Sequence, residues 1–192
     1  MASEEDDLWH ALLSSGQTVS TDLDFDQSHR IDSRSDAERY VIFLVGEEIY
    51  GIPIRKIEQI LKLFPTTKVP RTSDFLVGIG NVKGTVMPVI DLALRLKFHR
   101  SERSRKSRVL IVRHDGELYG MIVDNVIGVI SLDQSSLEEA PGAIGRLRVE
   151  YIESLARDEG KPVILLRLES ILATSDFVAE RFRHDTRDAL IS

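Results

Sequence analysis

The chain has 192 residues, no cysteine and a formal net charge of −6 at pH 7. Its length suits one good-sized domain or two small ones, and the lack of cysteine excludes disulfides, zinc–thiolate sites and cysteine nucleophiles. The acidic balance argues against a nucleic-acid binder, which usually needs a basic face. The opening MASEEDDLWH is acidic and lacks the apolar core of a signal peptide, and no apolar run approaches the roughly 20 residues that span a bilayer. We therefore expect a soluble, cytoplasmic protein.

Residues 1–38 form an acidic N-terminal extension. They hold ten acidic residues against two arginines. Residues 14–38 are polar, rich in Ser and Asp, and show no sustained period, so they cannot bury enough apolar surface to offset the entropy of ordering. We expect this extension to be largely disordered. Residues 4–13 carry one apolar stripe that includes Trp9, which fits either a frayed end or a short helix that docks on a partner.

From residue 39 onward the chain consists of short apolar runs rich in Val and Ile, with turn residues between them. Six runs predict strands: 40–45, 49–54, 85–92, 108–112, 118–123 and 162–168. Two segments are typical of hairpin turns, namely 46–48 (GEE) and 114–117 (HDGE). Helical patterning is confined to short pieces at 92–96, 151–156 and from Ser170 onward. Many short strands at regular spacing favour small barrels.

One unit of sequence occurs twice. Residues 39–61 align without a gap with residues 108–130, so that Tyr50 and Gly51 meet Tyr119 and Gly120. Each copy is a hairpin that leads into a third apolar stretch. The repeat predicts a mainly β fold of two related five-stranded barrels with a crevice between them and few short helices. We expect this domain to span residues 39–175, followed by a partly helical tail at 176–192.

Residues 78–92 (GIGNVKGTVMPVIDL) look at first like a phosphate-binding loop. A P-loop needs glycine before lysine, but here Lys83 precedes Gly84, and the dinucleotide fingerprint would need a third glycine where Lys83 stands. Both motifs also require a helix next, whereas the following TVMPVIDL predicts a strand. Gly78, Gly80 and Gly84 are better explained by tight turns or close backbone contacts. The sequence therefore predicts no nucleotide or other cofactor here.

The residues that could carry catalysis are few. The five histidines are scattered without metal-ligand spacing, and no serine lies in a nucleophile elbow. Asp91 and Asp124 each end an apolar strand, but nothing pairs them as acid and base, so we expect satisfied or exposed carboxylates. We predict no catalytic residue, no metal site and no enzymatic activity.

Seven cations fall within fourteen residues, 95–108, between the two copies of the repeat: Arg95, Lys97, Arg100, Arg103, Arg105, Lys106 and Arg108. This basic loop is either a solvated connection or a surface that docks an acidic partner or the chain's own acidic extension. RNA binding is less favoured, because Phe98 is the only Phe, Tyr or Trp that lies among these cations.

Three stretches, 43–61, 69–96 and 108–132, resemble the CheW family of coupling proteins from bacterial chemosensory arrays. The shared pattern is V-P, then G-x-x-N-x-[RK]-G-x-x-x-P-V-I-D-L, which here runs from Val69 to Leu92. The resemblance covers residues 39–173. It implies two intertwined five-stranded SH3-like β-barrels with a hydrophobic cleft between them, in agreement with the repeat.

The resemblance also implies a non-catalytic adaptor. Such proteins join the cytoplasmic tip of methyl-accepting chemoreceptors to the regulatory domain of a CheA-type histidine kinase. They touch the membrane only indirectly, through the receptors. The receptor groove would involve Ile57, Gln59, Ile60, Gly78, Asn81, Lys83 and Gly84, with the repeat-related Val123, Asp124 and Val126. Kinase contact is expected at apolar residues of an exposed barrel end.

The chain departs from the family pattern at several positions. Gln59 replaces the family glutamate and Lys83 the family arginine, while Glu153 stands at a usual glycine and Arg167 at a usual carboxylate. Lysine is a point charge and cannot reproduce the planar fork of arginine, so we expect partner contacts to be reset rather than the fold.

Two other functions remain open from the sequence. One is a small-ligand or nucleotide-binding sensor that uses the crevice between the barrels. The other, less favoured, is a small RNA-associated barrel that uses the basic loop.

Overall fold

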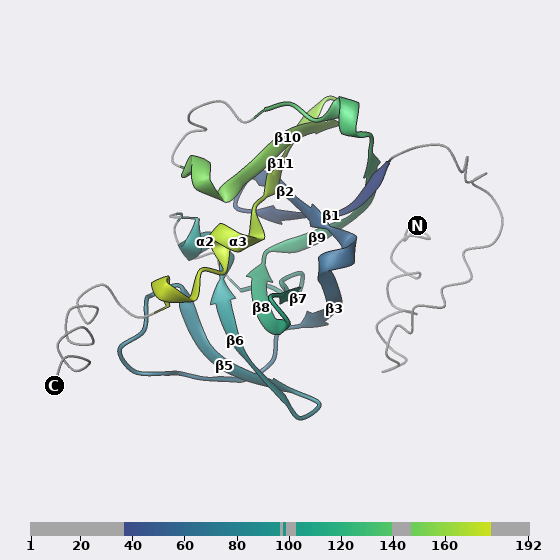
Figure 1. Cartoon of the computed structure of the whole chain (residues 1–192). Coiled ribbons are helices and arrows are strands. Elements are labelled where there is room, and N and C mark those ends of the chain that lie inside the picture. Colours follow the sequence, from purple (N-terminus) through teal and green to yellow (C-terminus); the bar gives the residue numbers. More distant parts are fainter. Residues whose placement is uncertain (1–36, 97, 99–102, 140–146, 178–192) are drawn as a thin grey trace, which may run out of the picture. The chain divides into compact units, whose positions relative to one another are not determined.

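The computed structural model describes residues 37–96, 98, 103–139 and 147–177 (Figure 1). The strands are β1 (Glu38–Val45), β2 (Glu48–Pro53), β3 (Ile57–Lys62), β4 (Thr66–Thr67), β5 (Leu76–Val82), β6 (Thr85–Asp91), β7 (Arg108–His114), β8 (Glu117–Val123), β9 (Asn125–Leu132), β10 (Ile152–Asp158) and β11 (Lys161–Leu166). Two short helices, α2 (Leu92–Arg95) and α3 (Leu168–Ile171), follow β6 and β11. Single 3-10 turns lie at Ile54–Lys56, Gln134–Ser136, Val149–Tyr151 and Thr174–Asp176.

The strands form two mixed sheets. Sheet 1 has the order β10-β11-β2-β1-β9, and sheet 2 has the order β3-β7-β8-β6-β5-β4. All pairs are antiparallel except β11 with β2 and β6 with β8. If sheet 1 is read from β9 to β10 and sheet 2 from β3 to β5, strands at the same place in the two orders are equivalent: β9 with β3, β1 with β7, β2 with β8, β11 with β6 and β10 with β5. Even β4 has a counterpart, because Glu138 forms an isolated bridge with Leu155 of β10. The mainly β fold is confirmed, and the two sheets are consistent with two SH3-like barrels.

The chain passes from one sheet to the other within each copy of the repeat. β1 and β2 belong to sheet 1, but the next strand, β3, pairs with β7 in sheet 2. β7 and β8 belong to sheet 2, but the next strand, β9, pairs with β1 in sheet 1. Each copy therefore gives its third strand to the other sheet, and in this sense the barrels are intertwined.

Both exchanged strands carry a β-bulge at the same place in the repeat. In β3 the register shifts between Ile57 and Gln59, which leaves Glu58 as the extra residue. In β9 the extra residue is Ile127, opposite a matching shift in β1. A bulge bends a strand and increases its twist. The same local distortion thus accompanies each crossing between the sheets.

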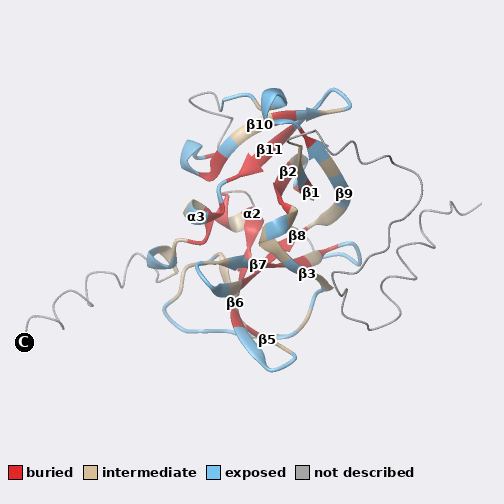
Figure 2. Cartoon of the chain, turned by 45° about the vertical axis from the view of Figure 1, so that its right-hand side comes forward, coloured by how far each residue is buried: buried red, intermediate tan, exposed pale blue. Residues whose placement is uncertain are grey.

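The central strands are apolar on both faces because each face meets a different core. In β7, Val109 and Ile111 belong to a cluster inside sheet 2, whereas Leu110 and Val112 belong to a second cluster, which we call the shared core. The shared core draws buried residues from both sheets and both helices, among them Phe43, Tyr50, Ile90, Leu92, Met121, Leu166 and Leu168. Figure 2 shows the buried residues along the central strands and the exposed ones at the hairpin ends. Each large apolar side chain that is fully buried contributes about 1.5–3 kcal/mol.

Two-residue turns close four of the hairpins. The expected turns at 46–48 and 114–117 are confirmed, since they join β1 to β2 and β7 to β8. Asp115 and Gly116 both have positive φ, at 49° and 82°, as a type I′ turn requires. Lys83–Gly84 and Glu159–Gly160 adopt the same conformation in the β5–β6 and β10–β11 hairpins. These two turns are equivalent in the two sheets.

The six expected strands and the helix at 92–96 are confirmed, but the helix expected at 151–156 is wrong. This segment becomes β10, because pairing with β11 buries Ile152 and Ala156 and outweighs a weak helical pattern. The helix expected from Ser170 shrinks to the end of α3 and one 3-10 turn. The helix expected at 4–13 lies outside the described residues, as does most of the tail.

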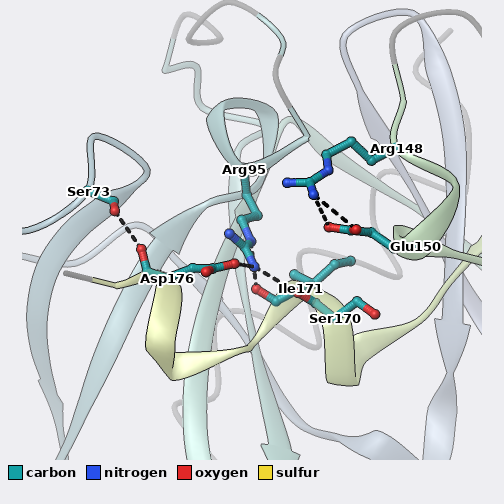
Figure 3. A network of polar contacts seen from close by, with 7 residues as sticks. All are labelled: Ser73, Arg95, Arg148, Glu150, Ser170, Ile171 and Asp176. Atoms are coloured by element: carbon teal, nitrogen blue, oxygen red, sulfur yellow. Dashed lines mark hydrogen bonds and ion pairs between the residues drawn. The ribbon is translucent and has the colours of Figure 1, made fainter. Parts of the chain in front are cut away.

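Arg95 fastens the two sheets together, so its interpretation as part of a solvated basic loop is wrong. The side chain is only 4% exposed. Its Nε donates to the carbonyl of Ile171 at 2.8 Å, and one terminal nitrogen donates to the carbonyl of Ser170 at 2.7 Å and pairs with Asp176 at 2.9 Å (Figure 3). The guanidinium also lies over the ring of Phe75, 4.6 Å from its centroid. These contacts tie α2 to α3 and to the segment after it.

We expect Gly78→Ala to destabilise the protein by on the order of 3 kcal/mol. Gly78 has a φ of 152°, and an added Cβ would lie 2.3 Å from the carbonyl oxygen of Thr67 in β4. Gly116→Ala is the control, because Gly116 has a φ of 82° but no atom within 4 Å of the added Cβ. It should cost only about 1 kcal/mol. Urea unfolding measures both, and equal losses would contradict the close approach of β4.

We expect Arg95→Met to lower the free energy of unfolding by about 2–4 kcal/mol, because it leaves two carbonyls and a carboxylate without their donor. Arg148 provides a matched control. Arg95 and Arg148 both lie over the ring of Tyr151, at 5.1 and 5.6 Å from its centroid, but the side chain of Arg148 is 52% exposed and pairs with Glu150. Arg148→Met should cost less than about 1 kcal/mol. Similar losses in the two variants, measured by urea unfolding, would show that Arg95 does not hold the sheets together.

Candidate functional site

Some of the residues expected in the partner groove surround the shared core. Ile57 and Ile60 of β3 and Val126 of β9 are partly buried and pack against this core, and Val123 is buried within it. Gln59 is half-buried but stands opposite Ile111, so it lies on the other face of β3 from the two isoleucines. The bulged strands thus bring together apolar side chains from both copies of the repeat.

A second group of expected site residues lies on β5 and its hairpin. Gly78 is buried under β4, whereas Asn81, Lys83 and Gly84 are exposed. The side-chain oxygen of Asn81 accepts the N–H of Gly84 at 2.9 Å and closes the turn. In Figure 1 this hairpin reaches beyond the rest of sheet 2. In the order of that sheet, β7 and β8 separate this hairpin from β3. The groove as expected from sequence therefore divides into a β3–β9 group and a hairpin group.

Asp124 has a structural role at the corner between β8 and β9. Its carboxylate accepts the N–H of Gly46 at 2.7 Å, and its own N–H donates to the carbonyl of Leu44 at 3.0 Å. These bonds fix the β1–β2 turn against the start of β9. Because the carboxylate is engaged, a partner contact by Asp124 would be additional to this role.

The sequence reasoning missed two exposed apolar residues on β9. Ile127 is 41% exposed and Val129 is 51% exposed. Val129 stands opposite Val41 as Ile60 stands opposite Leu110, so Val129 and Ile60 are equivalent in the repeat. The alignment of the two copies already paired them, and it could have extended the site to Val129. A third, Val86, is 64% exposed beside Asn81 at the hairpin end.

Two buried polar groups of the described residues, Asp91 and Tyr50, are engaged in structure. Asp91 is 1% exposed; it accepts the N–H of Leu94 at 3.2 Å as the N-cap of α2 and pairs with Arg103 at 2.5 Å. The expectation of a satisfied carboxylate is confirmed. Burial, then the hydrogen bond and charge of Glu48, raise the pKa of Tyr50 far above its usual value, so this phenol stays protonated. Asp91 thus caps a helix and forms an ion pair, and Tyr50 packs in the shared core.

The part of the chain that the structure describes holds neither a metal cluster nor a membrane-spanning helix. No cluster of three His, Asp or Glu side chains there is arranged to hold a metal ion. No helix there is long and apolar enough to cross a membrane.

Comparison with known proteins identifies the family. A family model described as the CheW-like domain matches residues 39–176. The chain is 28% identical over 142 residues to the chemotaxis protein CheW of Helicobacter pylori, which covers 73% of this chain and 85% of that one. It is also 28% identical over 135 residues to the chemotaxis protein CheW of Bacillus subtilis, covering 70% and 86% of the two chains.

A solved structure agrees with this family. The crystal structure of the scaffolding protein TtCheW from Thermoanaerobacter tengcongensis superposes with a TM-score of 0.68 at 32% sequence identity. The superposition covers 75% of this chain and 93% of that protein. The matched residues include both sheets, the exchanged strands and the hairpin group, and this protein therefore belongs to the CheW family.

Proposed function

We propose that this protein is a non-catalytic adaptor that couples the cytoplasmic tip of methyl-accepting chemoreceptors to the regulatory domain of a CheA-type histidine kinase. As a member of the CheW family, it is a chemotaxis coupling adaptor. The observation that supports these two partners is an apolar strip along β3 and β9 over the shared core, formed by Ile57, Ile60, Val126 and Val129. The comparisons do not favour a ligand or nucleotide sensor.

The apolar strip suits a receptor helix. Ile57, Ile60 and Val126 pack on the shared core but remain partly accessible, and Val129 extends the strip. An amphipathic helix binds such a strip through residues spaced three or four apart. The edge strands also twist at their bulges, which curves the surface around a rod-like partner. We infer that this surface receives the receptor.

The hairpin group supplies a second contact region. Lys83 begins the β5–β6 turn and is exposed, with the exposed Val86 close by on β6. At the equivalent position of the β10–β11 turn the residue is Glu159. Lys83 thus places a positive charge at a turn position where its counterpart carries a negative one. We assign Asn81, Lys83 and Gly84 to the receptor surface, and Val86 to contact with the kinase.

Coupling in such an adaptor requires no chemistry. Each partner changes the affinity of the adaptor for the other, and this coupling free energy is reciprocal. Arg95 and the exchanged strands join the two sheets. A partner bound to one sheet can therefore change the affinity of the other sheet for its own partner. A stiff body of this kind suits transmission between partners.

We expect Lys83→Glu to weaken binding to the receptor tip by about tenfold, or roughly 1.4 kcal/mol, through charge repulsion. Glu159→Lys is the matched control, since Glu159 occupies the equivalent turn position with nearly the same φ. It should leave binding unchanged. Calorimetric titration measures both variants, and circular dichroism checks their folding. If the folded Lys83→Glu protein binds the receptor tip normally, the hairpin is not part of the site.

Titration of the full chain against the regulatory domain of a CheA kinase from the same genome tests the proposal as a whole. We expect saturable one-to-one binding that persists at moderate salt, because the contact is partly apolar. Failure to bind any such kinase would leave the fold standing but remove the kinase as a partner. A rise in melting temperature with a small ligand would then bring the sensor function forward.

A further inference from the structure

Four cations from two separate segments form a basic patch on sheet 2. They are Lys62 at the end of β3, Arg105 and Lys106 in the turn before β7, and Arg108 at the start of β7. Lys62 and Arg108 are direct cross-strand partners. Side chains of directly opposed residues lie on the same face of a sheet. The fold thus places two like charges side by side.

The charges of the patch are not neutralised within the described part of the chain. Lys62, Arg105, Lys106 and Arg108 form no ion pair there, although neighbouring arginines do: Arg103 pairs with Asp91 and Arg113 with Glu58. Like charges directly opposite each other destabilise a sheet. A negatively charged ligand would relieve this repulsion between Lys62 and Arg108.

The turn that carries two of these cations is held in shape by hydrogen bonds. The hydroxyl of Ser107 accepts the N–H of Ser104 at 3.0 Å, and the hydroxyl of Ser104 accepts the N–H of Lys106 at 3.1 Å. Ser107 is 2% exposed and anchors the turn. One terminal nitrogen of Arg108 donates to the carbonyl of Arg105 at 2.8 Å. The cations therefore project from an ordered turn, which lowers the entropic cost of binding.

The patch continues the apolar strip of β3. Residues two apart on a strand share a face, so Lys62 lies on the side of Ile60, and Arg108 lies on the side of Leu110. Ile60 packs on the shared core, to which Leu110 belongs. Lys62 is exposed at the end of this row. The surface therefore changes from apolar to cationic along a single strand.

We propose that the basic patch docks an acidic polypeptide segment of a partner protein. Carboxylates match ammonium and guanidinium groups, and a polypeptide can also contact the apolar row beside them. A nucleic acid fits less well, because no aromatic residue interleaves with these cations and the chain is acidic overall, with a net charge of −6. The four cations lie outside the residues assigned to the receptor or the kinase, although the apolar row beside them belongs to the strip assigned to the receptor.

The test is fluorescence anisotropy of a labelled polyglutamate peptide with the full chain, at low and moderate salt. Lys62→Glu combined with Lys106→Glu reverses two exposed charges of the patch. Lys161→Glu combined with Arg167→Glu makes the same change in net charge at exposed positions of β11 and the start of α3. Thermal melting checks that both variants fold. The patch variant should bind the peptide at least about tenfold more weakly, with a smaller effect of salt, while the control retains most of its affinity.

Three results would overturn the proposal. Equal weakening in both variants would show that only net charge matters. No binding of the peptide to the unmodified chain at low salt would show that the patch has no such ligand. Tighter binding of a single-stranded RNA oligonucleotide or of anionic lipid vesicles, lost in the patch variant, would assign the surface to those ligands instead. Kinase binding by the patch variant reports separately on the adaptor function.

Discussion

The exchange of β3 and β9 between the sheets is the constraint on which the remaining structure depends. Each strand completes the sheet opposite to its own hairpin, and each does so through a bulge at the same position in the repeat. Because the third strand of each copy is supplied to the other, neither sheet is complete without residues from both copies. The shared core then buries apolar faces from both sheets at once. The two halves are therefore expected to unfold together.

The symmetry of the backbone is not matched by the chemistry of its side chains. At the bulges, Glu58 in one copy corresponds to the exposed Ile127 in the other. Before the two helices, Asp91 caps α2, whereas Arg167 makes no side-chain cap for α3. The two barrels thus present different surfaces on similar frames. An adaptor needs this difference, because two unlike partners have to find two unlike surfaces.

Much of the fold could be predicted from the sequence, since period-two apolar runs and the internal repeat are strong local signals. Four strands longer than two residues, β3, β5, β9 and β10, were not named as strands. β3 and β9 contain bulges that break the alternation, and β5 contains Gly78 and Gly80, which pack under β4 and Phe64. Nothing in the sequence distinguishes Arg95 from its neighbours in the run of cations. Its burial depends on Ser170, Ile171 and Asp176, which are distant in the chain.

The site was less predictable than the fold for a similar reason. Ile60 and Val129 are equivalent by sequence alone, but only the structure shows that Val129 is the more exposed of the two. The cross-strand contact between Lys62 and Arg108 depends on the register of β3 with β7. A shift of one residue in that register would place every side chain of β3 on the opposite face. Register is set by tertiary pairing and is poorly encoded locally.

The crossing of β3 and β9 is also the geometry of a domain swap, carried out within one chain. Two separate half-length chains, each with a hairpin and a third strand, would exchange the same strand about a twofold axis. Covalent linkage of the halves makes this exchange independent of protein concentration, because the second half is always present. It also frees each half to change its surface without a matching change in the other. The backbone thereby keeps the twofold arrangement of a homodimer, while the two halves present different surfaces, as the subunits of a heterodimer do.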